Sequence, residues 1–138
     1  MNSFENFKIG DEVEFSKTVS ETDVYMFAGI TGDFSPNHVN EEFMQKTPYK
    51  KRIAHGALAV GFISTASYLM IERKNIKAVS YGYDKVRFTK PIFIGDTITV
   101  KYQIEEIDKE KLRTVASCQV FNQHGEVCTV AQHILYHI

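Results

Sequence analysis

Asp33 and His38 are two residues whose types and spacing could do chemistry. They lie five positions apart, with Pro36 between them. A tight loop of this kind can bring a carboxylate and an imidazole to one water molecule, which is the arrangement that general acid–base catalysis requires. The simpler alternative is a solvated turn, because aspartate, asparagine and proline are all common turn residues.

Gly56, directly after His55, could supply a second chemical group. A glycine at the start of a helix lets its backbone N–H approach a ligand closely, and the free N–H groups there favour an oxygen atom with negative charge. Such a group would polarise a thioester carbonyl while charge develops on its oxygen. Equally, Gly56 could simply permit a close turn, with His55 as a packed side chain.

Asp33, His38 and His55 are also potential metal ligands. Their spacing matches no regular ligand pattern, so we expect no metal site. Ser64 lies about two helical turns beyond Gly56. A lone serine in an apolar helix most often bonds to the carbonyl four residues earlier, so the residues alone assign no function to Ser64.

The segment from Gly56 to Ile71 is apolar on nearly every side and predicts a long helix that is buried all round. It is shorter than the roughly 20 residues that span a bilayer, and charged residues flank it, so we expect a core helix. A chain of this size can surround a helix only by curling a sheet around it. We therefore expect a single α+β domain, residues 1–138, with an antiparallel sheet wrapped around one long buried helix.

Alternating apolar and polar residues supply the strands of that sheet. Ser20 followed by Asp23 resembles a helix capping box, and Gly32 is a helix stop. Pro36 and the residue before it should keep the segment 33–38 out of regular helix. The expected strands are 12–19, 78–89, 97–104, 112–121 and 127–136, and the expected short helices are 21–30 and 41–46.

The composition limits the partners and the compartment. The chain has 16 basic and 17 acidic residues, for a net charge of -1, so we expect neither nucleic acid nor a membrane as a partner. The N-terminus shows no basic region followed by an apolar run, so we expect no signal peptide. Cys118 and Cys128 do not make a disulfide framework. A turn at 124–125 would set Cys118 opposite residue 131 and Cys128 opposite residue 121. We interpret both cysteines as reduced packing residues of a cytoplasmic protein.

Three segments together resemble the MaoC-like (R)-specific enoyl-CoA hydratases. Residues 27–40, FAGITGDFSPNHVN, followed by residues 53–56, IAHG, are similar to the signature of that family. Residues 88–96, FTKPIFIGD, resemble the segment that those proteins carry after their central helix. The resemblance covers nearly the whole chain in the same order, and three separated motifs are far more specific than any one of them.

The resemblance implies a homodimeric hot-dog fold, in which the sheets of two subunits join and an acyl-thioester tunnel lies near the interface. It implies a hydro-lyase that reversibly hydrates trans-2-enoyl thioesters of coenzyme A or acyl-carrier protein to (R)-3-hydroxyacyl thioesters. Asp33 and His38 would hold and activate the water, and Gly56 would supply the oxyanion N–H. Ser64 matches a position whose hydroxyl helps to orient the site. No metal or redox cofactor is implied.

Ser35 and His55 are further candidates for orienting the site. Ser35 stands where members of the family frequently carry Asn, and Asn37 and Asn40 also depart from the usual residues. These differences leave the acid–base pair in place, so the reaction class is unaffected. They concern the fine geometry of the loop and the choice of substrate.

The basic run Lys50, Lys51 and Arg52 is a candidate for binding the phosphates of coenzyme A or an acidic carrier protein. Arg87 and Lys90 are weaker candidates of the same kind. A solvated basic loop would explain the run equally well.

Two other functions stay open. One is a non-catalytic acyl-thioester-binding subunit on the same fold, since a fold does not determine a function. The presence of Asp33, His38 and Gly56 together argues against it. The other is an acyl-CoA thioesterase, for which we would expect a carboxylate on the central helix, whereas residues 57–71 contain neither Asp nor Glu.

Overall fold

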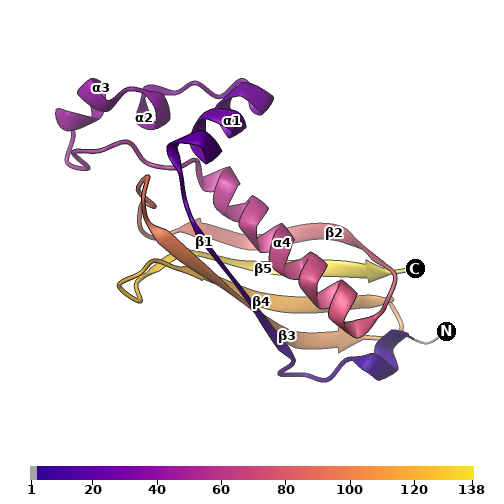
Figure 1. Ribbon diagram of the computed structural model, residues 1–138. Helices are drawn as coiled ribbons and strands as arrows, with labels where there is room; N and C mark the ends of the chain where they lie inside the picture. The colour runs from indigo at the N-terminus through magenta and orange to yellow at the C-terminus, as the bar shows by residue number, and fades with distance from the viewer. Residues whose placement is uncertain (1–2) are drawn as a thin grey trace.

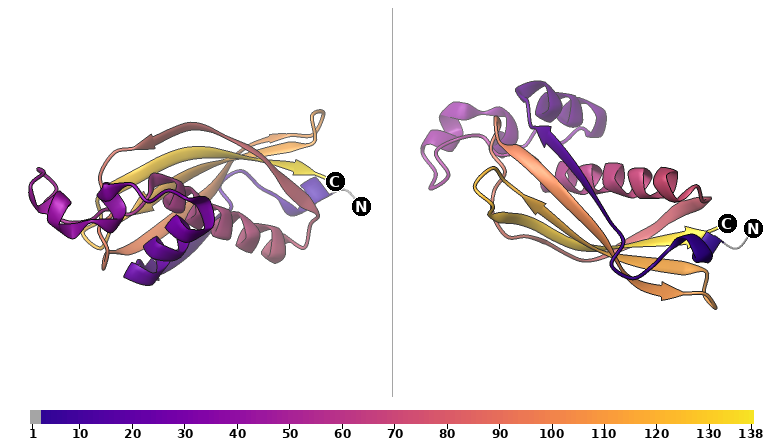
Figure 2. Two further views of the ribbon diagram at one scale, coloured as in Figure 1. Left: turned by 90° about the horizontal axis from the view of Figure 1, so that it is seen from above. Right: turned by 60° about the horizontal axis from the view of Figure 1, so that its bottom comes forward.

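The computed structural model describes residues 3–138. One antiparallel sheet of five strands curls around a long helix (Figure 1, Figure 2). The strand order across the sheet is β1-β3-β4-β5-β2. The helix is α4, Gly56–Lys74, and the strands are β1, Glu12–Thr18; β2, Ala78–Phe88; β3, Thr97–Asp108; β4, Arg113–Phe121; and β5, Val127–His137. The predicted α+β architecture is therefore confirmed. No helix among residues 3–138 is long and apolar enough to cross a membrane.

Three short helices lie together beyond one end of the sheet, next to the start of α4 (Figure 1). They are α1, Glu21–Thr31; α2, Pro36–Val39; and α3, Glu41–Gln45. The predicted capping box is present at α1, because Ser20 Oγ accepts the Asp23 N–H and the Asp23 carboxylate accepts the Ser20 N–H, both at 3.0 Å. Gly32 ends α1 with a φ of 84°, as predicted.

The segment 33–38 is less irregular than predicted, because Pro36 opens the helical turn α2. Proline has no backbone N–H, but at the first position of a helix that N–H would have no intrahelical partner anyway. The expectation that Pro36 excludes regular helix here is therefore wrong, and the turn carries His38. A short 3-10 helix, η1, Ser3–Asn6, precedes β1 and was not predicted.

The core lies between α4 and the inner face of the sheet. Alternate residues of β3, β4 and β5 are buried, as their patterns predict. Most of the apolar ones belong to one cluster with Phe62, Ile63, Ala66 and Met70 of α4. This packing holds the start of α4 in a fixed place at one end of the sheet.

The prediction that the central helix is buried all round is wrong for the single chain. Gly61, Ser64 and Tyr68 lie on an exposed stripe of α4, because the sheet covers only one side of the helix. The edge strand β2 is also open, and its Val79 and Tyr81 are exposed. The two exposed surfaces are the places where a further subunit could cover apolar residues.

Both cysteines are free and buried. Cys118 lies opposite Ala131, as predicted. The predicted pairing of Cys128 with Phe121 is wrong. Phe121 pairs with Val127 instead, and the register shifts between Val120 and Phe121.

His133 on β5 is fully buried at the centre of a polar chain inside the core. Its Nε2 lies 2.7 Å from Ser80 Oγ, and its Nδ1 lies 2.7 Å from the Tyr102 hydroxyl. Burial lowers the pKa of His133 to about 4, and burial raises the pKa of Tyr102. Both groups are therefore neutral at neutral pH.

We predict that His133 makes the fold sensitive to acid. A histidine in the unfolded chain has a pKa of about 6.5, while that of folded His133 is about 4. Between these values the unfolded state binds more protons, so stability falls as the pH falls. Lowering the pH from about 7 to about 4.5 should cost on the order of 2 kcal/mol through this residue. Urea unfolding at the two pH values measures the loss.

Two variants test whether His133 causes this loss of stability at low pH. His133→Gln should flatten the pH dependence, although buried His137, whose pKa burial also lowers, keeps part of it. His124→Gln, at an exposed turn, should leave the wild-type dependence unchanged. An unfolding free energy that is the same at both pH values in the wild type would contradict the prediction.

Candidate active site

Asp33, His38 and His55 come together where the loop after α1 meets the start of α4. One potential ligand atom from each lies within 4.8 Å of those of the other two. The rings of His38 and His55 stack, with centroids 3.8 Å apart and an angle of 28° between their planes. The acid–base pair expected from the sequence is thus brought together, and His55 joins it.

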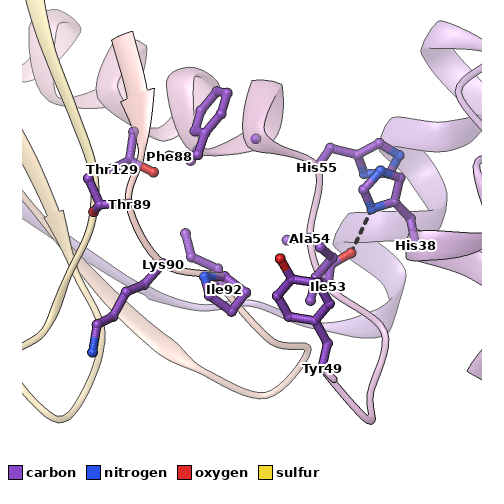
Figure 3. Close-up of a pocket in the computed structure, with 13 residues that line it drawn as sticks. His38, Tyr49, Ile53, Ala54, His55, Phe88, Thr89, Lys90, Ile92 and Thr129 are labelled. Carbon is purple, nitrogen blue, oxygen red and sulfur yellow. Dashed lines mark hydrogen bonds between the residues drawn. The ribbon is translucent and has the colours of Figure 1, made fainter. Parts of the chain in front are cut away.

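His38 has a defined tautomer. Its Nδ1 lies 2.7 Å from the backbone carbonyl of Ile53 (Figure 3), and because a carbonyl only accepts, Nδ1 carries the hydrogen. The Nε2 atom of neutral His38 is then free of a proton and can accept one from a bound molecule. The residue is only 9% exposed, so this exchange is screened from bulk water.

Two neighbours hold Asp33. The Ser35 backbone N–H donates to the Asp33 carboxylate at 3.2 Å, and His55 Nε2–H donates to the Asp33 backbone carbonyl at 3.0 Å. Phe27 packs against the His55 ring with centroids 4.6 Å apart. Ser35 and His55 therefore contact Asp33 directly. That these contacts orient the site for a reaction stays a prediction.

Gly56 is the first residue of α4, and no side chain caps the helix there. The Phe88 ring lies close over this glycine, because a Cβ on residue 56 would lie 2.7 Å from it and the ring would have to shift. An oxygen atom that approaches beside this ring would meet the Gly56 N–H and the positive end of the helix dipole. The geometry is suited to an oxyanion site, and that function stays a prediction.

His38, His55 and Gly56 line a cavity of about 240 Å³. Asp33 is exposed and is not among the lining residues, although it lies close to both histidines. Figure 3 shows His38 and His55 on one side of it and Phe88 and Thr129 on the other. Much of the remaining wall is apolar, formed by Ile53, Ala54, Ala59, Pro91 and Ile92. The cavity can hold a small apolar group with its reactive atoms against His38.

The stacked arrangement of His38 and His55 is unfavourable for a metal ion. An imidazole binds a metal along the lone pair in the plane of its ring. The lone pairs of two stacked rings whose planes differ by only 28° lie in nearly parallel planes, which makes it hard for both to meet one ion. The spacing of Asp33, His38 and His55 in the sequence did not indicate that the three side chains would converge.

Arg52 connects the short helices to one another. Its Nη2 donates to Glu21 of α1 at 2.9 Å, its Nε donates to Glu41 of α3 at 3.1 Å, and its Nη1 donates to the Tyr25 hydroxyl. Arg52 is absent from the cavity lining. These contacts favour a structural function over the phosphate binding expected from the sequence.

The other basic candidates differ in whether they line the cavity. Lys50, Lys51 and Arg87 are exposed, and none of them lines the cavity. Lys90, the weaker candidate, does line it and forms an ion pair with Glu126. Lys90 is therefore the candidate that the fold places at the cavity.

Ser64 lies on the exposed stripe of α4 and does not line the cavity. It sits beside the phenol of Tyr83 on β2. Within a single chain, Ser64 is not brought to Asp33, and its orienting function stays a prediction.

Phe88 and Thr129 are cavity residues that sequence reasoning missed. Phe88 belongs to a recognised motif, but nothing in the motif indicates that its ring covers Gly56. Thr129 is one of several threonines in predicted strands, and only the register of β5 brings it opposite Phe88. No local signal in the sequence could have identified it.

Comparison with known proteins identifies the family. The profile of the family described as "MaoC like domain" matches residues 4–126. The chain is 39% identical over 135 residues to the (R)-specific enoyl-CoA hydratase of Rhodospirillum rubrum, covering 98% of this chain and 86% of that protein. It is 35% identical over 115 residues to the 3-hydroxybutyryl-CoA dehydratase of Methylorubrum extorquens, covering 83% of this chain and 71% of that protein.

A solved structure with the same fold is the (R)-hydratase from A. caviae, described as involved in PHA biosynthesis. The two structures superpose with a TM-score of 0.85 at 22% identity, covering 96% of this chain and 98% of that chain. The fold is the hot-dog fold that the sequence resemblance implied. The chain belongs to the MaoC-like domain family, as predicted from the three motifs.

We predict that Arg52→Leu loosens the attachment of α1 and α3. The substitution removes charge-assisted hydrogen bonds to two glutamates that are themselves partly exposed, so the free energy of unfolding should fall by about 1–2 kcal/mol. Thermal and urea unfolding measure this loss. Lys51→Leu is the matched control, since the Lys51 ammonium only lies over the Phe93 ring. Equal losses in the two variants would argue against a connecting function for Arg52.

Proposed function

We propose that the protein is a hydro-lyase that reversibly adds water to trans-2-enoyl thioesters of coenzyme A or acyl-carrier protein, giving (R)-3-hydroxyacyl thioesters. The observation that carries the proposal is the convergence of Asp33 with His38, which lines a cavity together with Gly56. The names of the relatives, an (R)-specific enoyl-CoA hydratase and a 3-hydroxybutyryl-CoA dehydratase, support the same chemistry.

Gly56 acts on the thioester carbonyl. Its N–H donates to the carbonyl oxygen, and the N-terminus of α4 stabilises the negative charge that develops there. This polarisation draws electrons from the conjugated double bond and makes C3 electrophilic.

Asp33 and His38 act on the water. As the water oxygen bonds to C3, one of the pair takes a proton from it, and the Nε2 of neutral His38, whose Nδ1–H donates to Ile53, is suited to this step. The pair returns a proton to C2. One C–O bond and one C–H bond form, the double bond becomes single, and no net proton is consumed. The reverse sequence dehydrates the (R)-3-hydroxyacyl thioester.

We propose that the working form is a homodimer joined through β2 and the exposed stripe of α4. An edge strand carries unpaired backbone N–H and C=O groups that a second strand can pair. Val79 and Tyr81 on β2 and Tyr68 on α4 are exposed apolar residues that such an interface would cover. Ser64, on the same stripe, would then be enclosed near the site. The two free, buried cysteines support a reducing compartment such as the cytoplasm.

We predict that the purified protein hydrates crotonyl-CoA to the (R)-alcohol. The fall in absorbance of the conjugated double bond measures the rate, and chiral analysis assigns the product. Asp33→Asn and His38→Ala should each lower kcat by about 100- to 10,000-fold, the usual contribution of general acid–base catalysis. Asp108→Asn and His124→Ala, both outside the cluster of Asp33, His38 and His55, are the matched controls and should keep wild-type rates.

Two other outcomes of this assay would identify a different function. Folded protein that turns over neither crotonyl-CoA nor a longer enoyl-CoA would be a non-catalytic acyl-thioester-binding subunit. Release of free coenzyme A from the substrate would instead identify a thioesterase.

We predict that Val79→Arg, a charge placed on the edge strand β2, converts the dimer to a monomer. The measurement is molar mass by light scattering during size-exclusion chromatography. Lys101→Glu, on β3 inside the sheet, is a control that also changes a charge but should stay dimeric. A wild-type protein that elutes as a monomer would refute the proposed interface.

A further inference from the structure

His55 contacts both members of the acid–base pair at the same time. Its ring stacks on the His38 ring with centroids 3.8 Å apart, and its Nε2–H donates to the Asp33 backbone carbonyl at 3.0 Å. Figure 3 shows the His55 and His38 rings lying one over the other at the cavity wall. One imidazole therefore joins a residue of the loop after α1 to a residue of α2.

The hydrogen bond to Asp33 also fixes the tautomer of His55. A carbonyl oxygen only accepts, so Nε2 carries the hydrogen and Nδ1 of the neutral ring does not. Nδ1 is buried and has no hydrogen-bond partner among residues 3–138. A proton on Nδ1 would be buried without an acceptor, and it would place a second positive charge beside His38 whenever His38 is protonated. His55 therefore acts as a neutral ring.

The unpaired nitrogen of His55 destabilises the protein in a way that an apolar ring would not. Buried polar groups are nearly always hydrogen-bonded, and each exception calls for an explanation such as strain, catalysis or a bound molecule. Local rules of stability are most often broken at functional sites. The two residues that His55 contacts point to the catalytic explanation.

The stacked face of His55 is suited to a positive charge on His38. When His38 Nε2 accepts the proton of the water, its ring becomes a cation. An aromatic face attracts a cation within about 6 Å of its centroid, and the attraction is stronger where water is excluded. Here the two centroids are 3.8 Å apart and both histidines are buried. The contact is stronger after the proton transfer than before it, so it favours the transition state over the ground state.

We propose that His55 is a positioning residue that acts on both members of the acid–base pair. Its N–H holds the Asp33 backbone in place. Its neutral ring face fixes the plane of His38 and stabilises that ring while it holds the proton. The inference rests on the proposed hydration and adds to it a residue that acts through Asp33 and His38.

Two substitutions separate the two contacts. His55→Gln keeps an N–H for the Asp33 carbonyl and removes the ring face, whereas His55→Phe keeps an aromatic face and removes the N–H. Each should lower kcat for crotonyl-CoA by about tenfold, the size of one hydrogen bond or one cation–aromatic contact. His55→Leu loses both and should lower kcat by about a hundredfold. KM should change by less than about threefold in all three, because the lost contacts act on the transition state.

A double substitution tests whether the ring face acts through His38. In the His38→Ala background no imidazole is left to stack on, so His55→Gln should cause no further loss of the residual rate. Single-turnover assays at high enzyme concentration measure this rate. A further loss of about tenfold in this background would contradict the stacking contribution, because two residues that act independently have additive effects.

Ile104→Val, at a buried position of β3, is the control for lost stability and should keep the wild-type kcat and KM. His55 variants whose kcat stays within about twofold of the wild type would overturn the inference, and so would a rise in KM with kcat unchanged. A wild type that hydrates no enoyl-CoA would instead refute the proposed function, and this inference with it.

Discussion

The extended pair Ile53 and Ala54 makes the contacts on which the site depends. The Ile53 carbonyl accepts the Nδ1–H of His38 at 2.7 Å, and the Ala54 N–H donates to the carbonyl of Ile92 at 2.7 Å. Ile53 and Ala54 therefore connect α2, which carries the His38 imidazole, to the cavity-lining segment that contains Ile92. Because the pair leads directly into α4, it also sets where the Gly56 N–H lies. The tautomer of His38, the position of the Gly56 N–H and part of the cavity wall therefore all depend on the backbone of Ile53 and Ala54.

The short helices are attached more by polar contacts than by apolar burial. α1 buries Val24 and Ala28, and α3 buries Met44, which is little apolar surface for three helices. Arg52 and His55 supply directional hydrogen bonds in its place. Regions with few buried apolar contacts open at a lower free energy than the core does. The segment that carries Asp33 and His38 is therefore expected to open at a lower free energy than the sheet and α4 do.

The sequence predicted the parts of this protein that depend on short-range chemistry. Asp33 and His38 in one loop and Gly56 at a helix start follow from turn and helix rules, and three motifs with the same order as a known family supported the fold. Contacts between distant segments were beyond that reasoning. Arg52 looked like a phosphate ligand because its glutamate partners lie 31 and 11 residues away. Thr129 gave no signal, since its burial depends on strand register. The apolar pattern of α4 was correct as a pattern, but it does not distinguish burial by the chain's own sheet from burial by a second subunit.

Cys128 is an extra residue in β5, because Val120 pairs with Thr129 and Phe121 pairs with Val127. This bulge makes the cavity wall at Thr129 depend on the position of one residue as well as on substitutions. If the bulge moved one step along β5, so that Thr129 became the unpaired residue, Cys128 would lie opposite Val120. A thiol would then take the position of the hydroxyl, with every amino acid unchanged. A position-by-position alignment would show no difference after such a shift, because only the strand register changes and the sequence does not.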